Sequence, residues 1–424
     1  MTFSQRMVLL LLVASLLAGV VTGSNLYYRL AYLWIFVIGG SWLMSRLALR
    51  GVSFRRTARS LRAQVGQIFE ERFEVYNSSR LPRLWLEVRD ETALPGSRGS
   101  QVLSMIEGRE SRTYLVRTRL MERGVFPLGQ TVLAAGDLFG LFPVSRLYPA
   151  QDSLLVYPMM VEVHAFPSPQ GWLSGGEALR RRTHQITANA AGVRDYAPGD
   201  PLNRIHWLST ARRNRLIVKE FELDPLAEVW IFIDASRYVH CELPRPPLAL
   251  EEREMWRPSV KLPLPPLTEE YAVSVAASLA RFFLQKGRAV GLVYAGRYFS
   301  VLSAERGGRQ LGKILETLAL LHADGRMPLQ ALIDAQVRSL PRGSTVIVIT
   351  PSIGNEVVLS GELLSRRGMR PVMVLLDAAS FGGSSGTDHI AANLSVMGIP
   401  TCQVAYGDDL TTTLSEAARE QVWI

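Results

Sequence analysis

Val229-Trp230-Ile231-Phe232-Ile233-Asp234-Ala235-Ser236, residues 229–236, is the stretch that decides the fold class of the C-terminal half of the chain. Its five consecutive apolar residues are typical of a strand that is buried on both faces of a sheet. Strand and helix patterns alternate after it, with strands predicted at 290–294, 345–350, 372–376 and 402–406, and helices at 268–286, 310–322, 329–339, 356–367, 389–397 and 410–418. This alternation predicts an α/β doubly wound domain over residues 227–424, whose mostly parallel sheet is built by right-handed crossovers.

Two local features refine this domain. A proline-rich insertion, residues 243–266, separates the first strand from the first helix, and its irregular proline spacing favours an exposed loop over a polyproline ligand. Thr268 is the expected N-cap of the first helix, because Glu269 and Glu270 follow in the first turn and Gly287 comes after the helix end.

Residues 51–165 carry short β-rich runs, among them Phe73–Tyr76, Leu84–Val88 and Thr113–Val116. Turn residues separate the runs, and no segment with helical periodicity interrupts them. Regular short strands with such punctuation predict a β-sandwich-like domain. Residues 166–226 then form a linker segment that contains the most informative motif of the chain.

Two uncharged apolar runs, Met7–Gly23 and Leu30–Ser45, lie within residues 1–50 and predict a pair of transmembrane helices in a hairpin. Each run is slightly shorter than the ~20 residues that cross a bilayer. Six arginines follow the second run, whereas one precedes the first run and one lies between the two. By the positive-inside rule, we expect a multi-pass protein of the cell inner (cytoplasmic) membrane, with the lipid bilayer as a partner and the soluble domains in the cytoplasm.

Two other interpretations of the apolar runs stay open. The first run could be a cleaved signal peptide, with Arg6 as its basic region and small residues near Gly23 as its cleavage site. The second run would then still place its arginine-rich end in the cytoplasm. Both runs could instead be buried core helices, although neither shows a polar face.

The formal net charge of +9 comes almost entirely from the front of the chain. Residues 1–65 contain eight arginines and no acid, and the remaining 39 basic and 38 acidic residues nearly balance. A dispersed nucleic-acid footprint is therefore unsupported. Cys241 and Cys402 lack the spacing of a zinc or redox site and fit a reducing compartment, with a single disulfide in an exported protein as the alternative.

Residues 192–222 read GVRDYAPGDPLNRIHWLSTARRNRLIVKEFE and join the two soluble domains. Asp200 is the expected N-cap of a helix that starts at Pro201 and ends at Asn214, after which residues 216–218 begin a strand. Three residues are expected on the apolar face of this helix: Ile205, Leu208 and Ala211.

The same motif is rich in charged side chains: Arg194, Asp195, Asp200, Arg204, Arg212, Arg213, Arg215, Lys219 and Glu220. The pattern favours an ion-pair network that clamps two domains together. A surface for an acidic partner and a phosphate or nucleotide site are the alternatives, but no glycine-rich Walker loop accompanies the motif. Trp207 is interpreted as a packing anchor.

At these residues the chain resembles the bacterial family known as domain of unknown function 58. The resemblance rests on a set of signature residues that are also candidate interaction residues: Arg194, Tyr196, Gly199, Asp200, Arg204, Trp207, Arg212, Lys219 and Glu220. Residues 123–129 and 136–142 look like other stretches that the family shares. The resemblance implies a von Willebrand factor A-like C-terminal domain. It also implies a partner, because family members are thought to act as membrane-bound adaptors of MoxR-type AAA+ ATPases in protein complex assembly or envelope-related processes.

A von Willebrand factor A-like domain implies a metal site with Asp-x-Ser-x-Ser after the first strand and an aspartate after a later strand. This chain keeps Asp234 and Ser236, but Tyr238 stands at the second serine and Pro351 at the later aspartate. A divalent ion at a strand end needs several oxygen ligands. We therefore expect a degenerate site with no cofactor and no bound magnesium, although Asp377 after a neighbouring strand could compensate.

These observations predict a membrane-anchored, non-catalytic scaffold or adaptor. An enzyme of unknown reaction and a polyanion-binding membrane protein are the alternatives. Against an enzyme, only His184 and His206 lie near the motif, and no Gly-x-Ser-x-Gly or His-Glu-x-x-His sequence occurs. Neither a small-molecule substrate nor a nucleic acid is expected as a partner.

Overall fold

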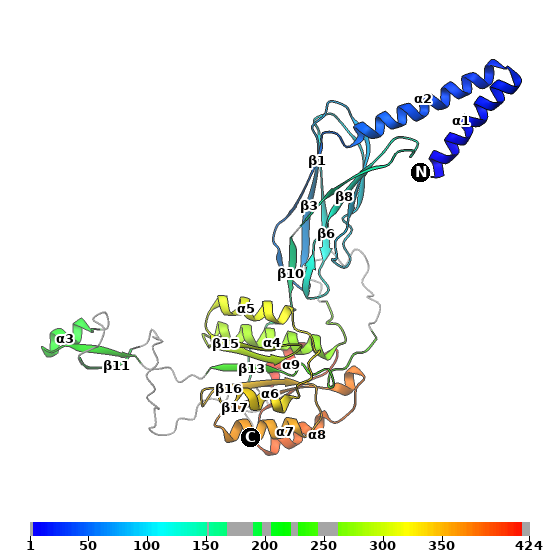
Figure 1. Ribbon diagram of the computed structural model, residues 1–424. Coiled ribbons are helices and arrows are strands. Elements are labelled where there is room, and N and C mark those ends of the chain that lie inside the picture. Colours follow the sequence, from blue (N-terminus) through cyan, green and yellow to red (C-terminus); the bar gives the residue numbers. More distant parts are fainter. Residues whose placement is uncertain are drawn as a thin grey trace. The chain divides into compact units, whose positions relative to one another are not determined.

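The computed structural model describes residues 3–150, 152–167, 190–196, 205–221, 228–244 and 262–417 (Figure 1). The chain divides into two compact units. The first unit contains the apolar N-terminal helices and the β-rich region up to Met159, and the second contains the α/β region.

Two apolar helices open the first unit: α1, Phe3–Thr22, and α2, Asn25–Ala48. They have 20 and 24 residues, which makes them longer than the predicted apolar runs and, at about 1.5 Å per residue, long enough to cross a bilayer. The Ser24 side chain caps α2 by accepting a hydrogen bond from the Leu26 N–H. Only 17% of the most apolar 18-residue stretch of each helix is buried. This disagrees with the interpretation of α1 and α2 as core helices. Both helices could span a membrane.

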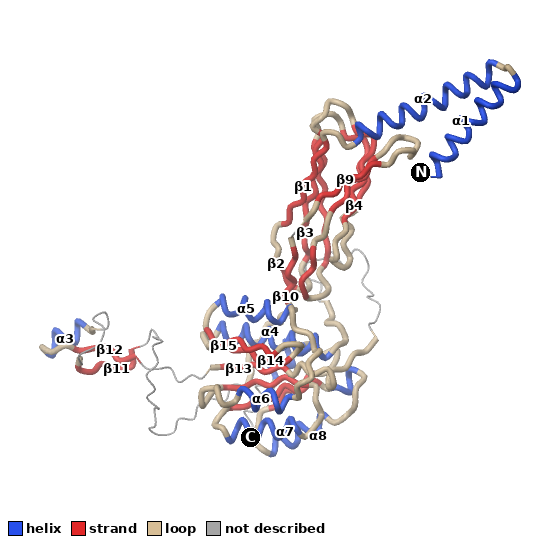
Figure 2. The backbone as a smooth tube through the Cα atoms, in the orientation of Figure 1, coloured by secondary structure: helices blue, strands red, loops and turns tan. Residues whose placement is uncertain are grey.

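The β-rich part of the first unit has ten strands in its described residues: β1 Val52–Ala58, β2 Arg62–Gln64, β3 Ile68–Asn77, β4 Arg83–Asp90, β5 Gln101–Ile106, β6 Ser111–Arg119, β7 Gly124–Pro127, β8 Thr131–Ala135, β9 Val144–Tyr148 and β10 Ser153–Tyr157. They form three sheets, with the orders β1-β3-β6, β5-β4-β8-β9 and β2-β10-β7. Figure 2 draws the strands in red. Neighbouring strands are antiparallel, except that β2 and β10 are parallel. The strands predicted within 73–76, 84–88 and 113–116 are confirmed as parts of β3, β4 and β6.

One apolar core joins the first two of these sheets. Phe73 of β3, Leu86 of β4 and Leu133 of β8 are fully buried in it. Along β3, alternate residues from Phe69 to Asn77 are buried, which is the period of a strand with one face on a core. Two antiparallel sheets that share one core make this part sandwich-like.

The second unit contains a six-stranded sheet. Its strands are β13 Val229–Ile233, β14 Val290–Ala295, β15 Phe299–Glu305, β16 Thr345–Thr350, β17 Arg370–Leu376 and β18 Thr401–Val404. Its helices are α4 Thr268–Gln285, α5 Gly308–Ala319, α6 Leu329–Gln336, α7 Glu356–Arg366, α8 Thr387–Val396 and α9 Leu410–Glu416, with a short 3-10 helix, η2, at Ala378–Phe381. The sheet order is β15-β14-β13-β16-β17-β18, and all neighbours are parallel except β14 and β15. Figure 1 shows α4 on one face of the sheet and α6, α7 and α8 on the other, so the predicted α/β sheet covered on both faces is confirmed.

Two local predictions for this sheet failed. β15 was missed because its residues alternate between exposed and half-buried, as suits an edge strand, and so lack the continuous apolar run of the central strands. Thr268 is the first residue of α4 and not its N-cap, which is Leu267. The Thr268 hydroxyl instead accepts a hydrogen bond from the Cys241 N–H (2.9 Å), so it joins α4 to the segment after β13.

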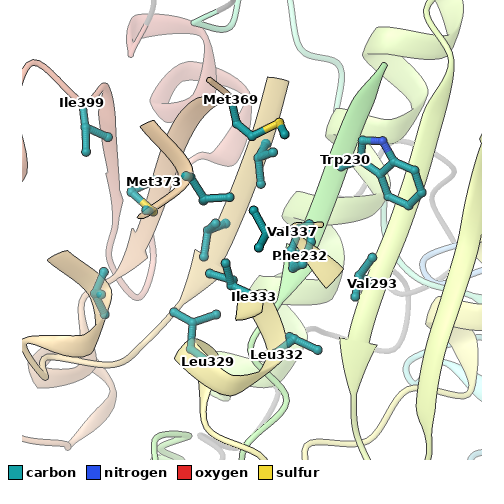
Figure 3. Packing of buried hydrophobic residues seen from close by; sticks show 14 of the residues in the cluster. Trp230, Phe232, Val293, Leu329, Leu332, Ile333, Val337, Met369, Met373 and Ile399 are labelled. Carbon is teal, nitrogen blue, oxygen red and sulfur yellow. The ribbon is translucent and has the colours of Figure 1, made fainter. Parts of the chain in front are cut away.

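Figure 3 shows the packing of one face of this sheet. Phe232 of β13 and Val293 of β14 lie in one cluster with Leu329, Leu332 and Ile333 of α6. All five residues of β13 are buried, which confirms that the strand has apolar neighbours on both faces. Because β13 is central and buried, the residues that follow it, beginning with Asp234, lie at a defined point on the edge of the sheet.

Candidate functional site

The centre of the α/β sheet brings together the ends of β13 and β16. These strands are parallel neighbours with Ile233 opposite Ile349, so their carboxyl ends meet at one edge. The chain continues from β13 to β14 on one side and from β16 to β17 on the other. In doubly wound sheets, ligands bind outside such a reversal of strand order. We term the polar residues at this place the switch site: Asp234, Ser236, His240, Thr268, Thr350, Ser352 and Glu356.

Asp234 follows β13 directly and is only 2% exposed. Its Oδ1 accepts a hydrogen bond from the Ser236 N–H (3.1 Å), and its Oδ2 accepts one from the Thr350 hydroxyl (2.8 Å). Burial raises the pKa of Asp234 and the Glu356 carboxylate acts in the same direction, although the two hydrogen bonds oppose this shift. Oδ2 therefore joins the ends of β13 and β16, whereas Oδ1 holds the turn after β13.

A chain of hydrogen bonds continues from Thr350 to α7. The Thr350 hydroxyl accepts a hydrogen bond from the Ser352 N–H (3.0 Å), and the Ser352 hydroxyl donates to Oε1 of Glu356 (2.8 Å). Glu356 is the first residue of α7, where the helix dipole favours a negative charge. These contacts hold the turn between β16 and α7 in one conformation.

His240 bridges the loop after β13 and the start of α4. Its Nε2 donates to the carbonyl oxygen of Asp234 (2.7 Å), because a carbonyl oxygen can only accept. Its Nδ1 lies 2.9 Å from Oγ1 of Thr268. Both ring nitrogens therefore have protein partners, and the geometry is that of a structural bridge.

Exposed arginine and tyrosine side chains border the switch site. Directly after β13, the guanidinium of Arg237 lies over the ring of Tyr238, with Cζ 4.8 Å from the ring centre, and its Nη2 donates to the Tyr238 hydroxyl (2.9 Å). After the neighbouring strand β14, the sequence repeats this pair as Arg297 and Tyr298. Tyr238 is 69% exposed and Tyr298 is 78% exposed, so neither ring is used for packing within the described residues.

Gly325 adds a third segment to this edge. Its N–H donates to the Ala235 carbonyl (3.0 Å), and a Cβ at this position would lie 2.0 Å from the Ala295 carbonyl oxygen. Only glycine therefore fits between the ends of β13 and β14, and the exposed Arg326 follows it. We term the resulting surface the arginine–tyrosine edge: Arg237, Tyr238, Arg297, Tyr298 and Arg326.

The switch site fits a divalent cation poorly. Asp234 and Ser236 lie together at the end of β13, but both Asp234 oxygens already accept hydrogen bonds. Asp377, which follows β17, accepts a hydrogen bond from the Thr387 hydroxyl (3.2 Å). In the described part of the chain, no three His, Cys, Asp or Glu side chains form a group that could hold a metal ion. A hard cation at a strand end would need more free oxygens than this arrangement offers.

The signature segment forms a small module of β11 Ala190–Asp195, α3 Trp207–Arg213 and β12 Ile217–Phe221. β11 and β12 are antiparallel, and the register places three pairs opposite each other: Arg194 with Val218, Val193 with Lys219, and Gly192 with Glu220. Asn214 ends α3 in the left-handed conformation (φ 53°), and the strand expected after it is present. The Tyr196 N–H donates to the Leu216 carbonyl (2.9 Å), which extends the two-stranded ladder.

The helix of this module begins later than predicted. α3 starts at Trp207, and His206 is its N-cap, with the side chain accepting a hydrogen bond from the first turn. The predicted start at Pro201 was wrong, because Ile205 makes a β-bridge with Val218. Three signature residues, Gly199, Asp200 and Arg204, lie outside the described residues.

The surface of α3 also differs from the prediction. No residue of this helix is buried, and Trp207 is 66% exposed, so it is not a packing anchor within the described residues. Of the predicted apolar face, Leu208 is 61% exposed and does not pack within the described residues, whereas Ile205 is buried (5%). Arg212 is exposed in the last turn of α3. Of the charged residues in the predicted ion-pair network, Asp195 and Arg215 form an ion pair (2.9 Å), and both side chains are more than half exposed.

Sequence reasoning did not single out four members of the switch site: His240, Thr350, Ser352 and Glu356. A signal for Thr350 was available, because it ends a predicted strand and polar residues at the ends of neighbouring parallel strands converge. No comparable signal exists for His240, because its role depends on the path of the turn after Ser236.

Comparison with known proteins gives one sequence relative and low-scoring structural likenesses. The uncharacterized protein YeaD of Bacillus subtilis (strain 168) is 24% identical over 260 residues, which is 60% of this chain and 57% of the relative. The chain thus spans 57% of the length of that relative. A CARDB domain from Pyrococcus furiosus matches 25% of this chain and 91% of its own, at 10% identity and a TM-score of 0.18. A beta-glucosidase from Listeria innocua matches 25% of this chain and 16% of its own, at 11% identity and a TM-score of 0.16.

The match to a family model falls on the signature module and the first strand of the α/β sheet. Residues 192–240 match the model described as "Protein of unknown function DUF58". This range contains α3, β12, β13 and all but the first two residues of β11, together with Asp234 and Ser236 of the switch site. Residues 192–240 of this chain are therefore similar to the family of proteins of unknown function DUF58.

Proposed function

We propose that this protein is a membrane-anchored scaffold or adaptor, held in the inner membrane by α1 and α2 with its soluble units in the cytoplasm. The exposed apolar surface and length of both helices support the anchor. Exposed Arg46 and Arg50 at the end of α2 support the orientation by the positive-inside rule. Arg56 is not part of this argument, because its side chain is 9% exposed and paired with buried acids.

The arginine–tyrosine edge is the observation that carries the adaptor proposal. Arginine and tyrosine are enriched among the residues that dominate protein–protein binding energy. Three exposed arginines, with no ion pair recorded for any of them in the described chain, give this edge a positive charge that complements an acidic partner segment. Asp234 and His240 are held by internal hydrogen bonds, which supports a docking surface in preference to a catalytic centre.

The fold and the partner are part of the same proposal. The order β15-β14-β13-β16-β17-β18 with one antiparallel edge strand supports a von Willebrand factor A-like domain. A MoxR-type AAA+ ATPase is the partner that the family resemblance implies, in protein complex assembly or an envelope-related process. We propose that it docks without a magnesium ion, because both Asp234 oxygens already accept hydrogen bonds from protein donors.

Charge reversal of the edge tests the docking surface. The tagged full-length protein is purified from native membranes, and the co-purifying MoxR-type ATPase is quantified. We expect the double variant Arg237→Glu with Arg297→Glu to recover about tenfold less ATPase, since each arginine would contribute a charge-assisted contact. Arg342→Glu is the matched control, because Arg342 is exposed and precedes β16 at the opposite end of the sheet. Equal recovery with all three proteins would refute the assigned surface.

Cysteine labelling in intact cells tests the orientation. A cysteine at the exposed Ser104 of β5 should react with a membrane-impermeant reagent only after lysis. A cysteine at the exposed Asn25, the first residue of α2, should react before lysis. Labelling of the Ser104 position in intact cells would show that the soluble region lies outside the cytoplasm.

A further inference from the structure

A hollow of about 640 Å³ lies at the foot of the helical hairpin, within the first unit. Its lining comes from the start of α1, the end of α2 and the segment that enters β9: Gln5, Trp42, Ser45, Arg46, Leu49, Arg50, Phe142, Pro143, Val144, Ser145 and Arg146. The start of α1 and the end of α2 belong to the same end of a hairpin. If the hairpin spans a membrane, the hollow therefore lies at the level of the lipid headgroups.

The lining of this hollow is cationic. It includes Arg46, Arg50 and Arg146 but no acidic residue. The Arg46 guanidinium lies 5.0 Å from the ring centre of Trp42, and Arg146 Nη1 donates to the Val52 carbonyl (3.2 Å). No ion pair of these three arginines occurs among the residues that the structure describes. A guanidinium presents five N–H donors, so each retains donors for an anion.

A tight turn beside the hollow carries two exposed apolar side chains. Asp137, 2% exposed, accepts hydrogen bonds from the N–H groups of Phe139 (3.0 Å), Leu141 (3.1 Å) and Phe142 (2.7 Å). Burial alone would raise the pKa of Asp137, but these donors outweigh it and lower the pKa below its usual value. The turn therefore keeps its charged anchor at neutral pH, while Leu138 and Phe139 point outward, 63% and 60% exposed.

The turn is attached to the hairpin. The Gln5 side chain of α1 donates through Nε2 to the Leu141 carbonyl (2.6 Å). The Ser41 hydroxyl of α2 also lies near Asp137 and helps to lower the pKa of its carboxyl group. Gly140 has a φ of +65°, which the turn requires and which other residues adopt only with strain. Leu138 and Phe139 are thus presented at the same end of the hairpin as the three arginines.

We propose that this hollow binds the phosphate group of an anionic phospholipid, with Leu138 and Phe139 inserted among the adjoining acyl chains. Arginines at a membrane surface bind anionic headgroups, and a tryptophan such as Trp42 suits the interfacial layer. Leucine and phenylalanine next to a basic surface bind the boundary of headgroups and acyl chains. The apolar neighbours favour a lipid as the source of the phosphate, because a free phosphate ion would gain nothing from Leu138 and Phe139. The inference rests on the proposed membrane anchor.

Lipid retention by the full-length protein tests the site. The protein is placed in nanodiscs of phosphatidylcholine with a minor share of phosphatidylglycerol, and the lipids that stay bound after release are identified by native mass spectrometry. We expect selective retention of phosphatidylglycerol, and about tenfold less of it with Arg46→Gln combined with Arg146→Gln. Arg55→Gln is the matched control, because Arg55 is an exposed arginine of β1 that does not line the hollow. Unselective retention, or equal retention by all variants, overturns the proposal.

Two further measurements separate the possible failures. Displacement of phosphatidylglycerol by inorganic phosphate would show that the hollow is an ion site without lipid specificity. In that case the double variant Leu138→Ser with Phe139→Ser should retain as much phosphatidylglycerol as the wild type. The lipid proposal instead expects this second double variant to weaken retention while the protein stays folded, since both side chains are exposed. Alkaline extraction of native membranes tests the proposed membrane anchor independently of lipid retention, because it measures whether the protein is released from the membrane. Release of the wild-type protein would refute the proposed anchor, whereas an integral protein without selective retention would refute the lipid site alone.

Discussion

Arg56 Nε lies 2.7 Å from Oε1 of Glu71, and this carboxylate is fully buried in the β-rich unit. The same guanidinium lies 3.0 Å from Oδ1 of Asp90, donates to the Leu128 carbonyl and covers the ring of Phe73 at 5.1 Å. Arg56 is one of the six arginines that follow the second apolar run and that the positive-inside rule counts for the cytoplasmic side. It is a core cation, because alternate residues of β1 turn their side chains to opposite faces.

Loss of the Arg56 charge should destabilise the β-rich unit. We expect Arg56→Met to lower the free energy of unfolding by about 3 to 5 kcal/mol, because it leaves two buried carboxylates without a cation. Its neighbour Arg55 is exposed, so Arg55→Met should change the free energy by less than about 0.5 kcal/mol. Denaturant titration of the full-length protein in detergent measures both. Similar values for the two variants would contradict the role of Arg56.

Asp90 should make the stability of this unit rise as the pH falls below neutral. Burial raises the pKa of Asp90 to about 6. A carboxyl whose pKa is higher in the folded than in the unfolded state binds more protons when folded, so its contribution to stability falls as the pH rises between the two values. From pH 7 to pH 5, the wild type should gain about 1 kcal/mol relative to Asp90→Asn. Asp152 is exposed, so Asp152→Asn serves as the control. If the difference in free energy of unfolding between the wild type and Asp90→Asn does not change with pH, the raised pKa of Asp90 is contradicted.

Thr350→Val should destabilise the α/β unit. Valine keeps the shape of threonine but removes the hydroxyl that donates to Oδ2 of the buried Asp234. We expect a loss of about 1 to 3 kcal/mol, the cost of a buried charged acceptor left without its donor. Thr412→Val removes an exposed hydroxyl from α9 and should be nearly neutral. A Thr350→Val protein with unchanged melting temperature would show that the hydrogen bond contributes nothing.

Magnesium should not bind at the switch site. Calorimetric titration of the full-length protein with magnesium and manganese is expected to show no sub-millimolar binding, because both Asp234 oxygens are engaged with protein donors. Sub-millimolar binding that Asp234→Ala abolishes would demonstrate a working metal site.

Trp207→Ala should leave the signature module folded but weaken partner recovery. Trp207 is 66% exposed, so its truncation should cost less than about 0.5 kcal/mol. Ile205 is 5% exposed, and Ile205→Ala should cost about 2 kcal/mol or more through lost packing. Hydrogen exchange of residues 205–221 reports the folding of the module, and co-purification reports the partner. Faster exchange in Trp207→Ala would mean that the ring stabilises the module after all.

Much of the architecture could be read from the residues, because secondary structure follows local periodicity. The apolar run Val229–Ile233 predicted a strand with the same bounds as β13. Apart from the missed β15 and the short η2, the predicted strands and helices follow it in the order that the structure has. The helix end at Asn214 was also predictable, because asparagine tolerates a left-handed conformation better than most residues. In contrast, the edge strand β15 lacks the continuous apolar run of the central strands, and its pairing with β14 defines it.

The sequence by itself determined the two apolar helices, the β-rich region, the alternating α/β pattern and the place of Asp234 after the central strand. Only the tertiary structure decided which polar groups meet. Thr350 lies far from Asp234 along the chain, and its hydroxyl reaches the Asp234 carboxylate because β13 and β16 are parallel neighbours. The same holds for Arg56, whose burial depends on the sheets that close around Glu71 and Asp90. The local sequence sets the periodicity and the number of charges. The free energy of each charge depends on its solvent exposure and on the charged and hydrogen-bonding groups around it, and the fold determines both.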